Sequence, residues 1–120
     1  MKYDENNIFA KILRGEIPCN KIYEDNFVLS FYDINPQKKI HALVIPKGKY
    51  VDLDDFNTNA SNDEIIGLMK GITTVAKKLG ISSIDGKGYR ALANISDYGG
   101  QEVPHLHFHL FGGEKVGKMV

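Results

Sequence analysis

The chain has 120 residues, of which 42% are hydrophobic and 25% charged, a composition typical of a globular protein with one hydrophobic core. Its 15 lysine and arginine residues balance 15 aspartate and glutamate residues, which excludes a net charge that would attract nucleic acid or an anionic membrane. No apolar stretch approaches the roughly 20 residues of a membrane span, and the polar residues 1–7 lack the apolar segment of a secretion signal. We therefore expect one domain over residues 1–120, with no nucleic-acid or membrane partner.

Cys19 is the only cysteine, which excludes an internal disulfide and a site with several cysteine ligands for a metal. We expect it to be a structural thiol. A reducing, cytoplasmic location is the expectation that follows.

The first half of the chain predicts a short helix and three strands. Residues 8–15 predict the helix, because apolar residues recur at four-residue spacing and a glycine suits its end. Residues 21–24 and 27–33 predict two strands that a tight turn joins. Pro36 places a loop after them, and residues 41–45 predict a third strand that a proline ends.

The second half predicts one long helix and two more strands. Ser61 and Glu64 match a capping box, and a glycine at position 80 ends the helix. Its apolar stripe is Ile65, Leu68, Met69, Ile72, Val75, Ala76 and Leu79. Residues 88–94 and 104–111 predict the fourth and fifth strands. The fold class we expect is α+β, an antiparallel five-stranded sheet with one face covered by the long helix, and a short N-terminal helix.

Three of the four histidines alternate with bulky apolar residues in the run 105–111. In a strand, His105, His107 and His109 would share one face while the apolar residues face a core. The preceding glycines let backbone amides approach an anion closely, although they also suit a plain turn. A neutral imidazole beside an anion site can attack phosphorus, and His107, flanked on both sides, is the best candidate.

Two other interpretations of the histidine run stay open. The first is a metal site, which would need two neighbouring histidines together with His41 or an acidic residue, because His105 and His109 lie about 13 Å apart along a strand. The second is a solvated sheet face that carries histidine without function. The chain has no phosphate-binding P-loop pattern and no acidic cluster for magnesium, so we expect a mechanism without metal or cofactor.

Several separated segments resemble one known family. The run 105–111 has the form His-φ-His-φ-His-φ-φ, with φ hydrophobic, which defines the histidine triad (HIT) superfamily. The likeness covers nearly the whole chain and is strongest to its Hint branch. The segments that carry it are Ile8-Phe9-Ala10-Lys11-Ile12, Gly15-Glu16-Ile17-Pro18, Phe31-Tyr32-Asp33-Ile34-Asn35-Pro36-Gln37, His41-Ala42-Leu43-Val44-Ile45-Pro46-Lys47 and Gly99-Gly100-Gln101-Glu102-Val103.

The resemblance implies a homodimeric hydrolase of purine nucleoside phosphoramidates, in which two sheets join edge to edge. The substrate class is adenosine monophosphate (AMP) joined to an amine through a P–N bond. By position, His107 would form a covalent nucleotidyl-histidine intermediate that water then hydrolyses. His109 would contact the phosphate, and His105 and His41 would support the arrangement.

The resemblance also implies the nucleotide site. Asp33 would hold the ribose hydroxyls, and Asn94 would contact the phosphate. The base slot would be formed by Phe9, Ile12, Ile17, Phe31 and Ile34. The phosphate side would include Gly100, Gln101, Glu102 and Val103, with backbone donors from the Gly-Gln segment. Without the resemblance, Asp33 could cap a turn, His41 could be a hydrogen-bonded core residue, and the apolar residues could be ordinary core.

Two departures from the family bear on specificity. Glu102 stands where eukaryotic Hint enzymes have serine, and a carboxylate repels a phosphate unless it turns away. The tail at residues 114–120 is short, which leaves the preferred amine open. The alternatives to a phosphoramidase are a dinucleoside polyphosphate hydrolase and a nucleotide-binding regulatory protein with little turnover.

Overall fold

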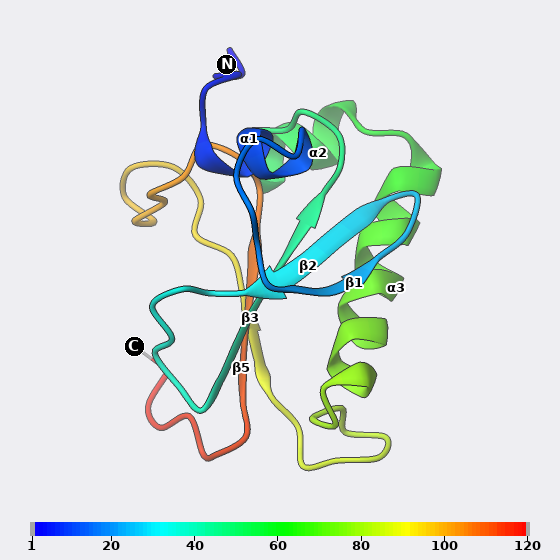
Figure 1. The fold of residues 1–120 in the computed structure, drawn as a ribbon, viewed down its shortest axis with the longest axis vertical. Helices are drawn as coiled ribbons and strands as arrows, with labels where there is room; N and C mark the ends of the chain where they lie inside the picture. The colour runs from blue at the N-terminus through cyan, green and yellow to red at the C-terminus, as the bar shows by residue number, and fades with distance from the viewer. Residues whose placement is uncertain (1, 120) are drawn as a thin grey trace.

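The computed structural model describes residues 2–119 and is organised around an antiparallel five-stranded sheet (Figure 1). Its elements are α1 (Ile8–Leu13), β1 (Lys21–Glu24), β2 (Val28–Tyr32), β3 (Ile40–Pro46), α2 (Leu53–Asn59), α3 (Asn62–Lys78), β4 (Arg90–Leu92) and β5 (Phe108–Gly112). The strand order is β1-β2-β3-β5-β4, and each neighbouring pair is antiparallel. The predicted α+β class, the five strands and both predicted helices are confirmed. Within residues 2–119 the helices are all too short or too polar to cross a membrane.

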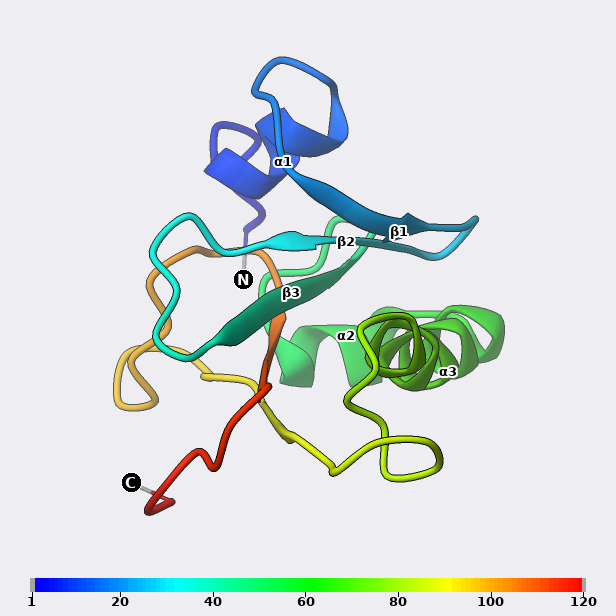
Figure 2. The ribbon, with the colours of Figure 1, turned by 60° about the horizontal axis from the view of Figure 1, so that its bottom comes forward.

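Helices cover both faces of the sheet, as Figure 2 shows with α1 on one side of the strands and α2 and α3 on the other. Alternate residues of β2 and β3 therefore enter two different clusters. The cluster on the α3 side contains Ile22, Val28, Ala42, Val44, Phe56, Leu68, Ile72, Val75, Leu106 and Leu110. The cluster on the α1 side contains Phe9, Leu29, Phe31, Leu43 and Ile45. The sheet thus separates the larger apolar cluster on the α3 side from a smaller one on the α1 side, and the site lies on the α1 side.

The long helix α3 begins at the predicted N-cap. The Ser61 side chain accepts from the Glu64 amide, and the Glu64 carboxylate accepts from the Ser61 amide, so the predicted capping box is present. The apolar stripe packs on β1, β2 and β3. The prediction was wrong for one residue of the stripe. Met69, which was predicted in this stripe, leaves 47% of its surface exposed and is not among the buried residues of α3.

The helix α2 was not expected from the sequence. It has only seven residues, too few for an apolar period, and only Phe56 in it is buried. Its N-cap is Asp52, whose side chain accepts from the Asp55 amide, and this Asp-x-x-Asp spacing is the signal that could have indicated the start. The predicted fourth strand is also shorter than expected, since only residues 90–92 pair with β5.

The fifth strand begins four residues later than predicted. His105, Leu106 and His107 precede it, and the Leu106 amide donates to the Tyr50 carbonyl instead of to a neighbouring strand. Pro104 has no amide hydrogen for a strand pair. The alternation nevertheless persists, because Leu106 and Leu110 both enter the core on the α3 side. The histidines therefore face the opposite side of the sheet, as expected, although only His109 lies within the strand.

Candidate active site

The four histidines gather on the face of the sheet that α1 covers. His41 lies on β3 and His109 on β5, in the paired central strands. The Phe9 ring of α1 meets the His107 ring edge to face, with ring centroids 4.9 Å apart. The rings of His107 and His109 are 5.0 Å apart. The three histidines predicted to act together and the earlier His41 are therefore brought into one cluster.

His105 is entirely buried, and both of its ring nitrogens have partners. Its Nε2 lies 2.9 Å from the Pro46 carbonyl oxygen, which can only accept, so Nε2 carries the proton. Its Nδ1 then accepts from the Tyr3 hydroxyl at 2.6 Å. Burial lowers the pKa of His105 to about 4, although the bond to Pro46 opposes this shift. His105 is a neutral, structural member of the cluster.

His107 is held in one tautomer by the backbone. Its Nδ1 donates to the His105 carbonyl oxygen at 2.7 Å, so in the neutral ring Nε2 bears an unshared electron pair. Burial lowers the pKa of His107 below the ordinary 6.5, with the bond to His105 acting in the opposite direction. At neutral pH the ring is thus uncharged and its Nε2 is a nucleophile of fixed orientation.

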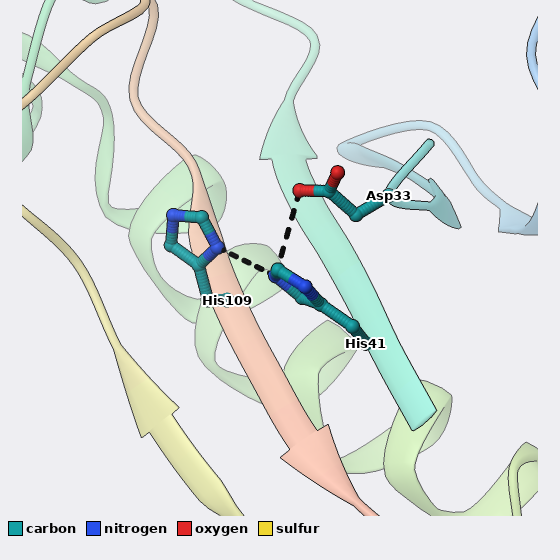
Figure 3. Close-up of side chains that lie close together, drawn as sticks. All are labelled: Asp33, His41 and His109. Atoms are coloured by element: carbon teal, nitrogen blue, oxygen red, sulfur yellow. Dashed lines mark hydrogen bonds and ion pairs between the residues drawn. The ribbon is translucent and has the colours of Figure 1, made fainter. Parts of the chain in front are cut away.

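A second hydrogen-bond chain fixes the tautomers of His41 and His109. The Gln37 amide donates to His41 Nδ1 at 3.1 Å, so the His41 proton is on Nε2. That Nε2 donates to His109 Nδ1 at 2.9 Å, as Figure 3 shows. The remaining proton of neutral His109 is therefore on its Nε2. Burial lowers the pKa of His109 to about 4, helped by His107 and His41, so this N–H is an uncharged donor.

Asp33 completes the arrangement from the end of β2. One carboxylate oxygen accepts from the Asn35 amide at 2.8 Å, which is the turn cap considered in the sequence. The other oxygen lies 3.5 Å from His41 Nε2. Because only one oxygen is used by the turn, the carboxylate can cap the turn and still meet a ligand.

Asp33, His41 and His109 place three potential metal-ligand atoms within 4.8 Å of one another (Figure 3). The chemistry of this donor set does not suit a metal ion. Coordination through His41 Nε2 would move the ring proton to Nδ1, where the Gln37 amide already donates. The Gln37 amide and the His41 Nδ1–H would then be two donors facing each other. A metal at this position would therefore break the hydrogen bond between Gln37 and His41.

A cavity of about 430 Å³ opens over the histidines. It is lined by Gln37, His41, Leu92, Asn94, Gly100, Glu102, Val103, His107, His109 and Phe111. The predicted phosphate-side residue Asn94 and the predicted nucleophile His107 therefore line one cavity. Figure 1 shows this part of the chain as a yellow to orange loop that leads into β5.

The loop before the histidines is braced internally in a way the sequence did not indicate. The Gln101 side chain accepts from the Ser96 amide and donates to the carbonyls of Val51 and Val103. The backbone amides of Gly100 and Gln101 donate to acceptors within the same loop. These two amides are therefore engaged within the loop in this structure, and their role as phosphate donors stays a prediction. Among the described residues, the backbone amides of Glu102 and Val103 have no acceptor within the loop. They are therefore the candidate phosphate donors, two residues after Gly100 and Gln101.

The predicted base slot is only partly assembled. Phe9 and Phe31 pack edge to face with centroids 5.6 Å apart and are both buried, and Ile12 packs against the same cluster. Ile17 is half-buried. Ile34 is 86% exposed and does not join the cluster. The phenylalanines thus belong to the core, and only the isoleucines offer free surface to a base.

Sequence reasoning missed three groups that orient the histidines. Tyr3 lies 102 residues away from His105 in the chain, so no local pattern links them. The Gln37 amide and the Pro46 carbonyl are backbone atoms, whose positions a residue pattern does not specify. The turn signal at Asn35-Pro36 was visible, but its role in directing an amide at His41 was not.

Comparison with known proteins identifies the family. The model of the HIT domain matches residues 14–116. An uncharacterized HIT-like protein of Azospirillum brasilense is 52% identical over 118 residues, which cover 98% of this chain and 94% of the relative. The purine nucleoside phosphoramidase of Escherichia coli is 40% identical over 116 residues, 97% of this chain and 94% of that enzyme.

Solved structures agree with the sequence relatives. The HIT family hydrolase from Clostridium thermocellum superposes with a TM-score of 0.86 at 38% identity, over 98% of this chain and 99% of that one. The fold, the histidine cluster and these matches define one class, and this chain belongs to the HIT domain family.

Proposed function

We propose that this protein hydrolyses purine nucleoside phosphoramidates, cleaving the P–N bond between AMP and an amine. The observation that carries the proposal is the neutral His107 ring, whose Nδ1 is tied to the His105 carbonyl and whose Nε2 is free in the cavity. The phosphoramidase name of the Escherichia coli relative supports this substrate class.

The proposed reaction has two steps. His107 Nε2 attacks phosphorus, the P–N bond breaks, and the departing amine takes up one proton. Water then attacks the nucleotidyl-histidine, releasing AMP and one proton and restoring the neutral ring. The sum is the addition of one water across the P–N bond. His109 Nε2–H donates to a phosphoryl oxygen as negative charge gathers there.

The substrate position follows from the residues around His107. The Asn94 side chain and the amides of Glu102 and Val103 are donors for the phosphate. The Asp33 oxygen not used by the turn accepts from the ribose hydroxyls. The base lies against Ile12, Ile17 and Ile34, with Phe9 and Phe31 beneath them. His105 and His41 hold the rings in place and do not touch the substrate.

The test is mass spectrometry of enzyme quenched during turnover of adenosine phosphoramidate. We expect a mass increase of one adenylyl group, located on His107. Turnover without this adduct in either rapid-quench or steady-state samples, or an adduct on another residue, would contradict the proposed intermediate. Comparing the rate with that for diadenosine triphosphate separates the phosphoramidase from the alternative dinucleoside polyphosphate hydrolase.

The homodimer with sheets joined edge to edge and the cytoplasmic location are also proposals. Support for the dimer is the position of β4, a strand of three residues at the free edge of the sheet. Sedimentation equilibrium measures the oligomeric state, and cell fractionation measures the location.

A further inference from the structure

The charges around the cavity differ from those expected of a site that binds two phosphate groups. Among the described residues, ten line the cavity, and none of them is lysine or arginine. Three are histidines, and burial lowers the pKa of each of them, so they are neutral at pH 7. Of these ten described residues, Glu102 is then the one with a formal charge. The space beside the nucleophile is therefore negatively charged.

The Glu102 carboxylate is available to a ligand. The residue is exposed and also lines the cavity, so we infer that its carboxylate lies at the mouth. The ion pairs within residues 2–119 do not include it, whereas Glu24, for example, is held by Lys21 and Lys47. The negative charge of Glu102 raises the pKa of His107, against the larger effect of burial, which indicates that the two groups are near each other.

The proposed reaction indicates which part of the substrate lies near the Glu102 carboxylate. Attack on phosphorus is in line, so the leaving group lies on the side of phosphorus away from His107. The nucleoside occupies the side of Asp33, where one carboxylate oxygen caps the turn and the other accepts from the ribose hydroxyls in the proposed complex. The leaving amine therefore points to the mouth, where Glu102 is the charged group that it meets.

We propose that Glu102 makes this site select AMP amides whose amine carries a second, cationic group. Amides with a neutral leaving amine are cleaved less efficiently, and amides with an anionic leaving group least efficiently. The inference rests on the proposed function and names the substrate class within it. An ammonium group in the leaving amine meets an unpaired carboxylate, whereas a carboxylate or a second phosphate in the leaving group is repelled. The same repulsion acts against dinucleoside polyphosphates, in which the leaving group is itself a nucleotide.

The experiment compares three AMP amides of similar length, made from 1,3-diaminopropane, propylamine and β-alanine. At low ionic strength we expect kcat/KM to fall in that order, by roughly 3- to 10-fold at each step, from one charge interaction at a partly solvated site. Added salt at about 0.5 M should compress the series, because it screens an exposed charge.

Glu102→Gln should bring the three kcat/KM values within about 2-fold of one another, and Glu102→Ser should do the same. The matched control is Asp85→Asn, which removes one negative charge from an exposed loop that does not line the cavity. This control should retain the full order. Circular dichroism and thermal melting establish that each variant is folded.

The outcomes separate the inference from the proposed function. If the propylamine amide is cleaved but the series is flat, or the order survives both Glu102 substitutions, the selection by Glu102 is wrong and the phosphoramidase proposal stands. If the wild-type protein cleaves none of the three amides, the proposed function fails, and the inference fails with it.

Discussion

The two faces of the sheet use alternate residues of the same strands, yet they bury different chemistry. On the α3 side, Ala42, Val44 and Leu110 are fully buried and purely apolar. On the α1 side, the neighbouring His41 and His109 are held by specific hydrogen bonds. No buried side-chain nitrogen or oxygen within residues 2–119 lacks a partner. The α3 side therefore depends mainly on packing, whereas the α1 side combines a smaller apolar cluster with histidines whose donors and acceptors must be matched.

The largest expected effect is loss of turnover on the histidine side. His107→Ala should lower kcat/KM for adenosine phosphoramidate by at least about 10³-fold, because the ring supplies the attacking nitrogen. Steady-state kinetics measure the loss. The melting temperature should change far less than for a core truncation, since the ring lines a cavity. Retention of a tenth or more of the activity would show that another group attacks phosphorus.

The corresponding change on the apolar side should act on stability instead. Leu110→Ala removes a fully buried side chain from β5 and should lower the free energy of unfolding by about 2–5 kcal/mol. Urea denaturation measures it. At temperatures where the variant is folded, kcat should stay within an order of magnitude of the wild type.

The matched control for Leu110 is Ile84→Ala, which truncates a side chain that is 70% exposed and should change stability by less than about 0.5 kcal/mol. Equal losses for the two variants would contradict the assignment of Leu110 to the core.

Acid should destabilise the histidine side. Burial lowers the pKa of all four histidines, so the unfolded chain binds protons more readily than the folded one. Their contribution is complete above pH 6.5 and is lost as pH falls towards about 4, the pKa of His105 and His109. The free energy of unfolding should fall over this range, by at most about 1.4 kcal/mol per pH unit for each histidine.

Histidines and carboxylates lose their contributions to stability in different pH ranges. The pKa values of Asp25, Glu24 and Glu64 are lowered from their ordinary values, so their contributions are lost only in more acidic solution. Urea denaturation at intervals between pH 7 and 4.5 therefore reports on the histidines. A free energy of unfolding that stays constant over this interval would mean that the rings are not buried in the neutral form.

The smallest effect is expected from the loss of a single hydrogen bond on the histidine side of the sheet. Tyr3→Phe removes the donor to His105 Nδ1 and leaves a buried acceptor without a partner, which should cost about 1–3 kcal/mol. Thermal or urea denaturation measures it. Tyr98→Phe, at a fully exposed ring, is the control and should change stability by less than about 0.5 kcal/mol. Equal effects of the two changes would remove the proposed role of the Tyr3 hydroxyl.

The two faces were not equally predictable from the sequence. Leu106 and Leu110 were assigned to the core correctly, because alternation is a property of consecutive residues. The capping box at Ser61 and Glu64 was also correct, since its partners are three residues apart. The histidine face was predicted as a cluster, but the tautomers could not be, because their partners come from distant segments and from backbone atoms.

The differences between expectation and structure have the same origin. The expected phosphate donors of Gly100 and Gln101 are used within the loop, through contacts that depend on how the Gln101 side chain folds back. The start of β5 was placed too early, because Leu106 pairs with the Tyr50 carbonyl. Neither contact leaves a periodic signal in the sequence.

The sequence by itself determined the elements with clear periodicity, the apolar side of the sheet and the family, because each depends on the order of neighbouring residues. The tertiary structure alone decided which nitrogen of each histidine carries a proton and where Asp33 meets His41. It also decided that the residues of 2–119 that line the cavity beside His107 include a single carboxylate and no lysine or arginine. These features depend on atoms that only folding brings within hydrogen-bond or Coulomb range of each other.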